Sequence, residues 1–179
     1  MTLNDILVSA LAQLDRGNDP QTLDVWRDKF TRFANDAQAD LASAILPCRR
    51  EDLAAVDGVL DLTALARKCT KVVGLKLDGK DVPIVRGADS WTLAVDTDGT
   101  YEVTYRYQPR DLTSPSDESE LPAHCHGLIV TYVVARERMS GDRSTQAGSN
   151  IYFELYQTGK AKLRPHVGDP AAYRIINKY

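Results

Sequence analysis

The sequence predicts an α+β fold in which a four-helix bundle carries an inserted small antiparallel β domain. Apolar residues recur at helical spacing in residues 2–45 and 121–163, and mostly at a period of two between them. The strands follow one another with no helix between, which favours antiparallel pairing. The expected parts are the two N-terminal helices (1–46), the β insertion (47–112), a loop and αα-hairpin completing the bundle (113–164), and an extended C-terminal arm (165–179).

Composition narrows the class of protein. The chain has 179 residues, 43% of them hydrophobic, which is enough to bury a core and argues against wholesale disorder. The net charge of −3 predicts no overall attraction to nucleic acid or to an anionic membrane. The three cysteines, Cys48, Cys69 and Cys125, do not form the framework of a secreted disulfide protein. With no secretion signal and no apolar run of bilayer length, we expect a soluble protein made and kept inside a cell, or in a particle assembled there.

Two helices are expected before Pro47. The first spans Thr2–Asp15. The second opens with Asp19 as N-cap and Pro20 at the first helical position, and it runs to about Ile45. The apolar positions that define them are Leu3, Ile6, Leu7, Ala10, Leu11 and Leu14, then Leu23, Trp26, Phe30, Phe33, Ala37, Leu41 and Ile45.

The sequence pattern in the middle of the chain predicts strands and tight turns. The strands are expected at Val59–Leu62, Lys71–Leu77, Val82–Val85, Trp91–Val95 and Tyr101–Tyr107, with residues 61–65 as a strand end or a short helical turn. Asp57-Gly58 predicts a turn. Asp78-Gly79 predicts a hairpin between the second and third strands, and Asp98-Gly99 a stronger one between the last two. In the last strand, Tyr101, Val103, Tyr105 and Tyr107 share one face.

An αα-hairpin is expected over Leu121–Lys162. Pro122 suits the first turn of its first helix, and Gly141 ends that helix. Because the run between them is rich in β-branched residues, a buried strand is the competing interpretation; its length and the arginines at its end favour a helix. In the second helix, from Ser144 to Leu163, Ile151, Leu155 and Thr158 follow i, i+4, i+7 spacing beside Tyr152 and Tyr156.

No motif predicts catalysis. His124 and His126 flank Cys125, but on a helix i and i+2 diverge by roughly 200°, and no third metal ligand is evident. The same geometry leaves Cys125 without a suitably placed base. The acidic loop Asp111–Glu120 lacks the spacing of a calcium-binding loop. The Gly-rich phosphate loops and the Gly-x-Ser-x-Gly elbow are absent from the sequence, so we expect neither an enzyme nor a cofactor.

Three stretches carry a resemblance to a known family. They are Asp57–Leu65 with Lys71–Gly79 behind it, Tyr101–Thr113, and Leu121–Arg136. Their order is a β segment that ends in Tyr105-Arg106-Tyr107 and Pro109, then an acidic loop, then Leu121-Pro122-Ala123-His124 opening a helix. In this order the chain, over roughly residues 1–164, resembles the head-to-tail connector (adaptor, or head-completion) proteins of tailed bacteriophages.

The resemblance implies a structural virion protein. Such subunits form a ring, usually dodecameric, beneath the portal, where the ring continues the DNA channel and docks the tail. The implied partners are the portal protein, tail or stopper proteins and further copies of the chain; genomic DNA passes through without sequence-specific binding, and no membrane is involved. The implied location is the virion neck between capsid and tail, with the host cytoplasm during assembly. The portal contacts would lie on the C-terminal arm, at Arg164, Tyr173, Ile175, Ile176 and Tyr179.

Two alternatives from other classes stay open. One is a different assembly factor, such as a tail-completion protein or a small cytosolic scaffold. The other is a metal-dependent enzyme built on His124, His126 and the acidic loop Asp111–Glu120.

Overall fold

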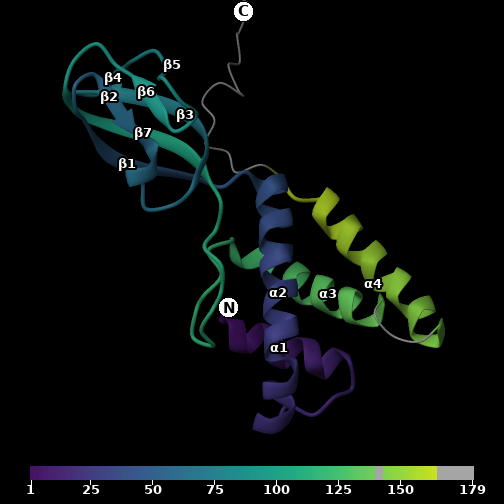
Figure 1. The fold of residues 1–179 in the computed structure, drawn as a ribbon. Helices are drawn as coiled ribbons and strands as arrows, with labels where there is room; N and C mark the ends of the chain where they lie inside the picture. Colours follow the sequence, from purple (N-terminus) through teal and green to yellow (C-terminus); the bar gives the residue numbers. More distant parts are fainter. Residues whose placement is uncertain (140–142, 165–179) are drawn as a thin grey trace, which may run out of the picture. The chain divides into compact units, whose positions relative to one another are not determined.

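A computed structural model describes residues 1–139 and 143–164 (Figure 1). The described residues form two compact units, a helical unit of residues 1–45 and 109–164 and a β unit of residues 46–108. The helices are α1 (Leu3–Gln13), α2 (Pro20–Ile45), α3 (Ala123–Met139) and α4 (Arg143–Ala161). The strands are β1 (Cys48–Ala55), β2 (Val59–Asp61), β3 (Cys69–Leu77), β4 (Lys80–Asp81), β5 (Val85–Arg86), β6 (Thr92–Ala94) and β7 (Gly99–Tyr107), with a 3-10 turn at Leu62–Ala64 after β2. The α+β class and the antiparallel pairing are therefore confirmed.

The first two helices begin at capping residues; the cap at Asp19 was expected from the sequence, and the one at Thr2 was not. Thr2 and Asp5 form a reciprocal capping box, in which the backbone N–H of each donates to the side chain of the other. The Asp19 carboxylate accepts hydrogen bonds from the N–H groups of Gln21 and Thr22, and Pro20 takes the first position of α2. Capping thus sets both helix starts within a residue or two of the sequence prediction.

All four helices contribute to one apolar core. In Figure 1, α2 crosses α1 and α3, whereas α3 and α4 lie side by side. The core residues from α1 and α2 are Leu3, Ile6, Leu7, Ala10, Leu11, Phe30, Ala34, Ala37, Leu41, Ala42 and Ile45. Those from the rest of the unit are Leu112, Leu121, Cys125, Ile129, Val130, Val133, Val134 and Tyr156. The competing interpretation of the apolar run after Pro122 as a strand is thereby wrong, because it forms α3.

Close packing joins α3 to α4. The ring of Tyr132 meets that of Tyr156 edge-on, with 5.0 Å between centroids. A Cβ placed on Gly159 would lie 2.3 Å from Leu128 Cδ2, so any larger residue would require the Leu128 side chain to move at this close approach of the two helices. That approach explains a glycine inside α4, where it costs about 1 kcal/mol of helix propensity.

Two polar side chains of α2 hold the segment that returns from the β unit. Asn35 pairs with the backbone of Leu112 in both directions: its Oδ1 accepts from the N–H at 2.8 Å, and its Nδ2 donates to the carbonyl at 3.0 Å. Gln38 is buried, and its Oε1 accepts from the Ser119 hydroxyl at 2.7 Å. The Leu3 N–H donates to the Asp117 carbonyl at 2.8 Å. The returning segment is therefore fixed to both N-terminal helices.

The β unit contains two antiparallel sheets. The four-stranded sheet has the order β1-β7-β3-β4, and the three-stranded sheet the order β2-β6-β5. Their shared apolar cluster includes Leu53, Leu60, Leu75 and Leu93 together with Tyr101, Val103 and Tyr105. The last three point inward from β7 at alternate positions, and Tyr107 packs half-buried beside them, as the tyrosine alternation predicts.

Two expectations for the β unit are wrong. The hairpin predicted around Asp98-Gly99 does not form, because β7 pairs with β1 and β3 while β6 pairs with β2 and β5. Instead the Asp98 carboxylate accepts from the Gly58 N–H at 2.8 Å, which ties it to the predicted Asp57-Gly58 turn, where both residues have positive φ. The strand expected at Val82–Val85 is also wrong, because only Val85 of it lies in a strand, β5. The Asp78-Gly79 hairpin is confirmed: both residues have positive φ, and β3 pairs across them with the short β4.

Replacing Asn35 by alanine leaves both backbone groups of Leu112 without their partner. We expect the free energy of unfolding of the helical unit to fall by about 2 kcal/mol, the cost of unsatisfied, partly buried polar groups. Urea unfolding followed by helical circular dichroism measures the change. The control is Asn18→Ala at an exposed loop position, which should shift the free energy by less than about 0.5 kcal/mol. Equal stabilities of the two variants would contradict the role of Asn35.

Tyr105 gives the β unit a dependence on alkaline pH. Burial, together with the neighbouring Glu51 carboxylate, raises the pKa of Tyr105 from 10.0 to about 12. The unfolded chain therefore loses this proton first, so the stabilisation is complete below pH 10 and disappears as pH rises toward 12. Urea unfolding at a series of pH values measures this effect. Between pH 10 and 12, we expect the free energy of unfolding of the Tyr105→Phe variant to fall less than that of the natural chain. Tyr152→Phe, in the helical unit, is the control and should leave the pH dependence of the β unit unchanged.

Candidate functional site

The two histidines at the start of α3 lie in different surroundings. His126 Nε2 lies 2.8 Å from the Leu121 carbonyl, and burial lowers the pKa of His126 below its ordinary value. His124 is exposed, whereas Cys125 between them is fully buried in the helical core. Burial raises the pKa of the Cys125 thiol, which disfavours the thiolate a nucleophile needs. Within residues 1–139 and 143–164, no three His, Cys, Asp or Glu side chains gather to hold a metal ion.

The acidic loop uses its carboxylates to shape its own backbone. Asp117 accepts from the N–H groups of Thr113 and Ser114 at 2.8 and 2.7 Å and from the Thr113 hydroxyl at 3.0 Å. These hydrogen bonds hold the pKa of Asp117 below its ordinary value. Glu120 accepts from the Arg110 N–H at 3.3 Å. The loop therefore builds the returning segment and presents no cluster of free carboxylates for a cation.

The arm residues chosen from the sequence fall largely outside the described chain. Arg164 is described and is exposed beyond the end of α4. Tyr173, Ile175, Ile176 and Tyr179 lie outside the described residues.

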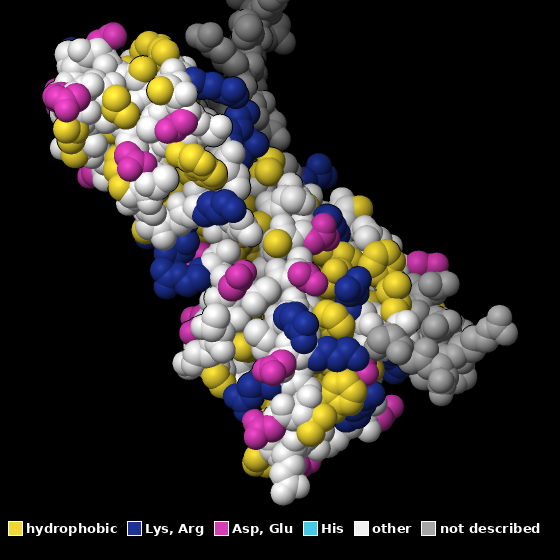
Figure 2. Space-filling model, in the orientation of Figure 1, with side chains coloured by type: hydrophobic (Ala, Val, Ile, Leu, Met, Phe, Trp, Pro, Cys, Tyr) yellow, Lys and Arg dark blue, Asp and Glu magenta, His cyan; other side chains and the backbone are white. Residues whose placement is uncertain are grey.

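Two large apolar side chains on the outer side of α4 are exposed. Ile151 and Leu155 stand one helical turn apart and are 60% and 57% exposed. Hydrophobic side chains gather over α4 in Figure 2. The neighbouring stripe, about 100° around the helix, carries Tyr156, which is fully buried. The helix therefore has apolar side chains on two sides, and only one of them is covered.

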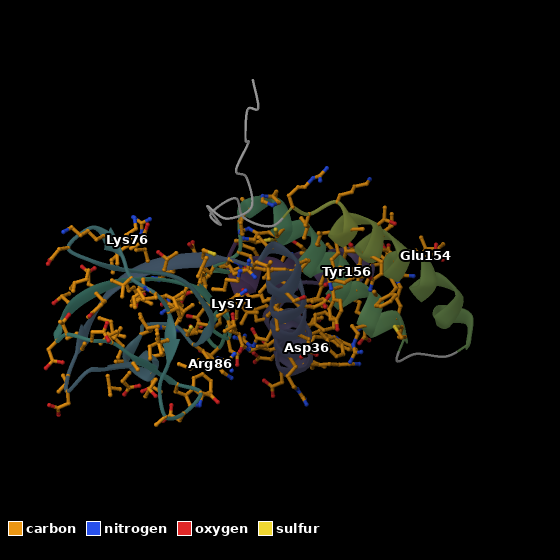
Figure 3. The ribbon with its side chains drawn as sticks, turned by 90° about the horizontal axis from the view of Figure 1, so that it is seen from above. Asp36, Lys71, Lys76, Arg86, Glu154 and Tyr156 are labelled. Carbon is orange, nitrogen blue, oxygen red and sulfur yellow. The ribbon has the colours of Figure 1, made fainter. Side chains whose placement is uncertain are left out.

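An ionic and hydrogen-bonded cluster around Tyr156, which Figure 3 labels, fixes the inner side of α4 to α2. The Tyr156 hydroxyl donates to one Asp40 carboxylate oxygen, and Lys160 Nζ lies 2.6 Å from the other. Burial raises the pKa of Tyr156 and the Asp40 carboxylate raises it further. Partial burial opposes ionisation of Asp40, but the hydrogen bonds from Lys160 and Tyr156 outweigh it and lower its pKa. The orientation of α4, and with it the outward direction of Ile151 and Leu155, is thus set.

A second buried charge secures the end of α3. Glu137 is only 7% exposed, and its carboxylate accepts from Arg16 at 3.2 Å and from Lys29 at 2.6 Å. The Arg16 guanidinium also lies 3.8 Å from the ring centroid of Trp26. The cluster satisfies a carboxylate that would otherwise be costly to bury, and it joins the α1–α2 loop, α2 and α3.

Sequence reasoning found the spacing of Ile151 and Leu155 but not their exposure. The two residues lie on the same stripe as Thr158, and Tyr152 and Tyr156 lie beside it, so periodicity alone does not tell which stripe faces the core. Gly159, three residues after Tyr156, could have indicated the stripe that faces the core, because a small residue inside a helix is typical of a close contact with another helix.

Comparison with known proteins adds no family. Models of protein families give no match to the chain, and the curated protein sequences give none either. In the part of the chain that the structure describes, none of the helices combines the length and apolarity that a bilayer-spanning segment requires.

Removing the Asp40 carboxylate should loosen α4. Asp40→Ala leaves the buried Tyr156 hydroxyl without its acceptor, so we expect a loss of about 2 kcal/mol in the free energy of unfolding at neutral pH. Because the Asp40 pKa is lowered, its contribution is present above its ordinary value of 3.8 and disappears as pH falls through the lowered pKa. The difference between the variant and the natural chain should therefore shrink in strong acid. Asp36→Ala, exposed on the same helix, is the control and should change stability little.

Proposed function

We propose that this chain is the subunit of a head-to-tail connector of a tailed bacteriophage, a ring beneath the portal that continues the DNA channel and docks the tail. The observation that carries the proposal is the exposed apolar stripe of Ile151 and Leu155 on a helix whose other side is already buried. A surface helix with two apolar sides is completed by a neighbouring subunit. Support also comes from the order of the sequence motifs, which places a β insertion between two pairs of helices.

We also propose a role in the ring for each part of the chain. The four helices act as a bundle that forms the body of the ring, and the α4 stripe contacts the next subunit. A contact between two different surfaces repeats around a rotation axis and closes into a ring, as a dodecamer requires. The β unit, whose sheets carry their own apolar core, projects toward the tail or outward.

The C-terminal arm supplies the contact with the portal. The arm begins near Arg164, and its proposed anchors are Tyr173, Ile175, Ile176 and Tyr179. An extended segment that enters a groove or sheet of its partner is a common mode of recognition. The ring itself takes no cofactor and no catalytic role, and DNA passes through it without sequence-specific contact.

Three variants separate the two contacts. A chain that ends at Arg164 should keep its circular dichroism spectrum and melting temperature but lose most of its co-sedimentation with purified portal rings. Ile151→Glu with Leu155→Glu should leave the monomer folded but prevent subunits from filling the ring. Gln157→Glu, exposed on α4 away from the stripe, is the control and should assemble as the natural chain does.

Two results would contradict the proposal. If the truncated chain binds portal as fully as the natural chain, the arm is not the portal contact. If the Ile151 and Leu155 variant still completes rings of natural stoichiometry, the α4 stripe is not the contact between subunits.

A further inference from the structure

The β unit contains an open cleft of about 880 Å³. The first half of β3 forms one wall, and the loop and hairpin that include β5 form the other. The lining includes the side chains of Lys68, Lys71, Val72, Ile84, Arg86 and Trp91. We refer to this feature as the β3–β5 cleft; it lies wholly within residues 46–108, so its role is independent of whether the helices form a ring.

One edge of β3 is open along the cleft. The short strand β4 pairs only with Lys76 and Leu77, and the Leu75 carbonyl accepts one more bond from the Val82 N–H. Before Leu75, β3 has β7 on one side and, among the described residues, no strand on the other. An open strand edge presents backbone donors and acceptors that can pair with an added strand.

The charge of the cleft is positive. Lys68, Lys71 and Arg86 are exposed there, and none of them makes an ion pair within the residues that the structure describes. Lys71 and Arg86 lie on the same side of the β unit (Figure 3), where lysine and arginine side chains are also seen beside β3 in Figure 2. The one carboxylate in the lining is that of Asp89. It accepts hydrogen bonds within its own turn, from the Trp91 N–H at 2.7 Å and from the Thr92 hydroxyl at 3.1 Å.

Apolar side chains lie among these cations. Trp91 is 45% exposed and Ile84 is 43% exposed, and both contribute to the lining. A strand places alternate side chains on opposite faces, so a bound strand could direct one set of side chains to Ile84 and Trp91 and expose the other to the cations.

We propose that the β3–β5 cleft binds an extended acidic segment of a partner protein, which adds to the open edge of β3 as a further strand. Backbone hydrogen bonds to β3 supply affinity, and Lys71 and Arg86 select carboxylates. A second copy of the chain does not supply such a segment. Its acidic loop is held to α1 and α2, and the sequence from Arg164 onward carries Arg174 and Lys178 against the single carboxylate side chain of Asp169.

The test uses the full chain and an end-capped peptide of alternating Glu and Val as the probe. Its binding is followed by amide NMR, through the residues 70–72 and through the indole N–H of Trp91, identified as the signal lost in Trp91→Phe. We expect saturable shifts at these positions. Lys71→Glu and Arg86→Glu should each weaken binding by roughly five- to tenfold, because an attraction becomes a repulsion. Lys80→Glu, an equal charge change on exposed β4 outside the cleft, should leave the affinity unchanged.

Peptides N-methylated at every odd or every even residue test the strand pairing. One of the two loses the donors that face β3 and should not bind, while the other should bind as the parent does. The inference is overturned if both methylated peptides bind like the parent, or if a Lys-Val peptide binds as well as the Glu-Val peptide. It is also overturned if no shift develops at millimolar peptide, or if oligothymidylate shifts these signals and the peptide does not, since the ligand would then be a nucleic acid.

Discussion

The helical unit depends on the hydrogen bonds by which α2 holds the chain as it returns from the β unit. Two of its helices precede the insertion and two follow it, so the apolar core exists only when the segment before α3 is fixed. Asn35 fixes this segment as a paired strand would, because its side-chain amide hydrogen-bonds both the N–H and the C=O of Leu112. Gln38 adds a buried bond to Ser119. Closing so long a loop costs entropy, and these satisfied polar contacts help to offset it while selecting one register.

Local signals in the sequence predicted most helices and strands. The pairing of the strands was predicted less well, because it depends on nonlocal contacts. The caps at Thr2 and Asp19 and the apolar spacing of α2 act within a few residues, so helix bounds could be read directly. Strand partners are chosen by burial across the whole β unit. The β1 strand was missed because Arg49, Arg50 and Glu51 give an edge strand the charged composition of a loop, although it pairs along the full length of β7.

At the candidate surfaces too, local features could be predicted from the sequence, whereas features that depend on nonlocal contacts could not. Helical geometry predicted that His124 and His126 point in different directions, and in α3 His124 is exposed whereas His126 is half-buried beside the Leu121 carbonyl. The exposure of Ile151 and Leu155 could not be read from periodicity, because it depends on which side of α4 Asp40 and Gly159 bring to the core. The β3–β5 cleft is also nonlocal, since β3 and Arg86 meet only after β4 ends early.

Both units bury apolar cores of their own, and Ile151 and Leu155 of α4 remain exposed. The connector account is tested most directly by the mass of the chain in solution, measured by light scattering alone and after mixing with portal rings encoded in the same genome. The account predicts that the chain, as a monomer or a ring, joins the portal at a fixed stoichiometry and completes a ring of subunits on it. A chain that stays at its free mass in the presence of portal at every ratio would contradict the account.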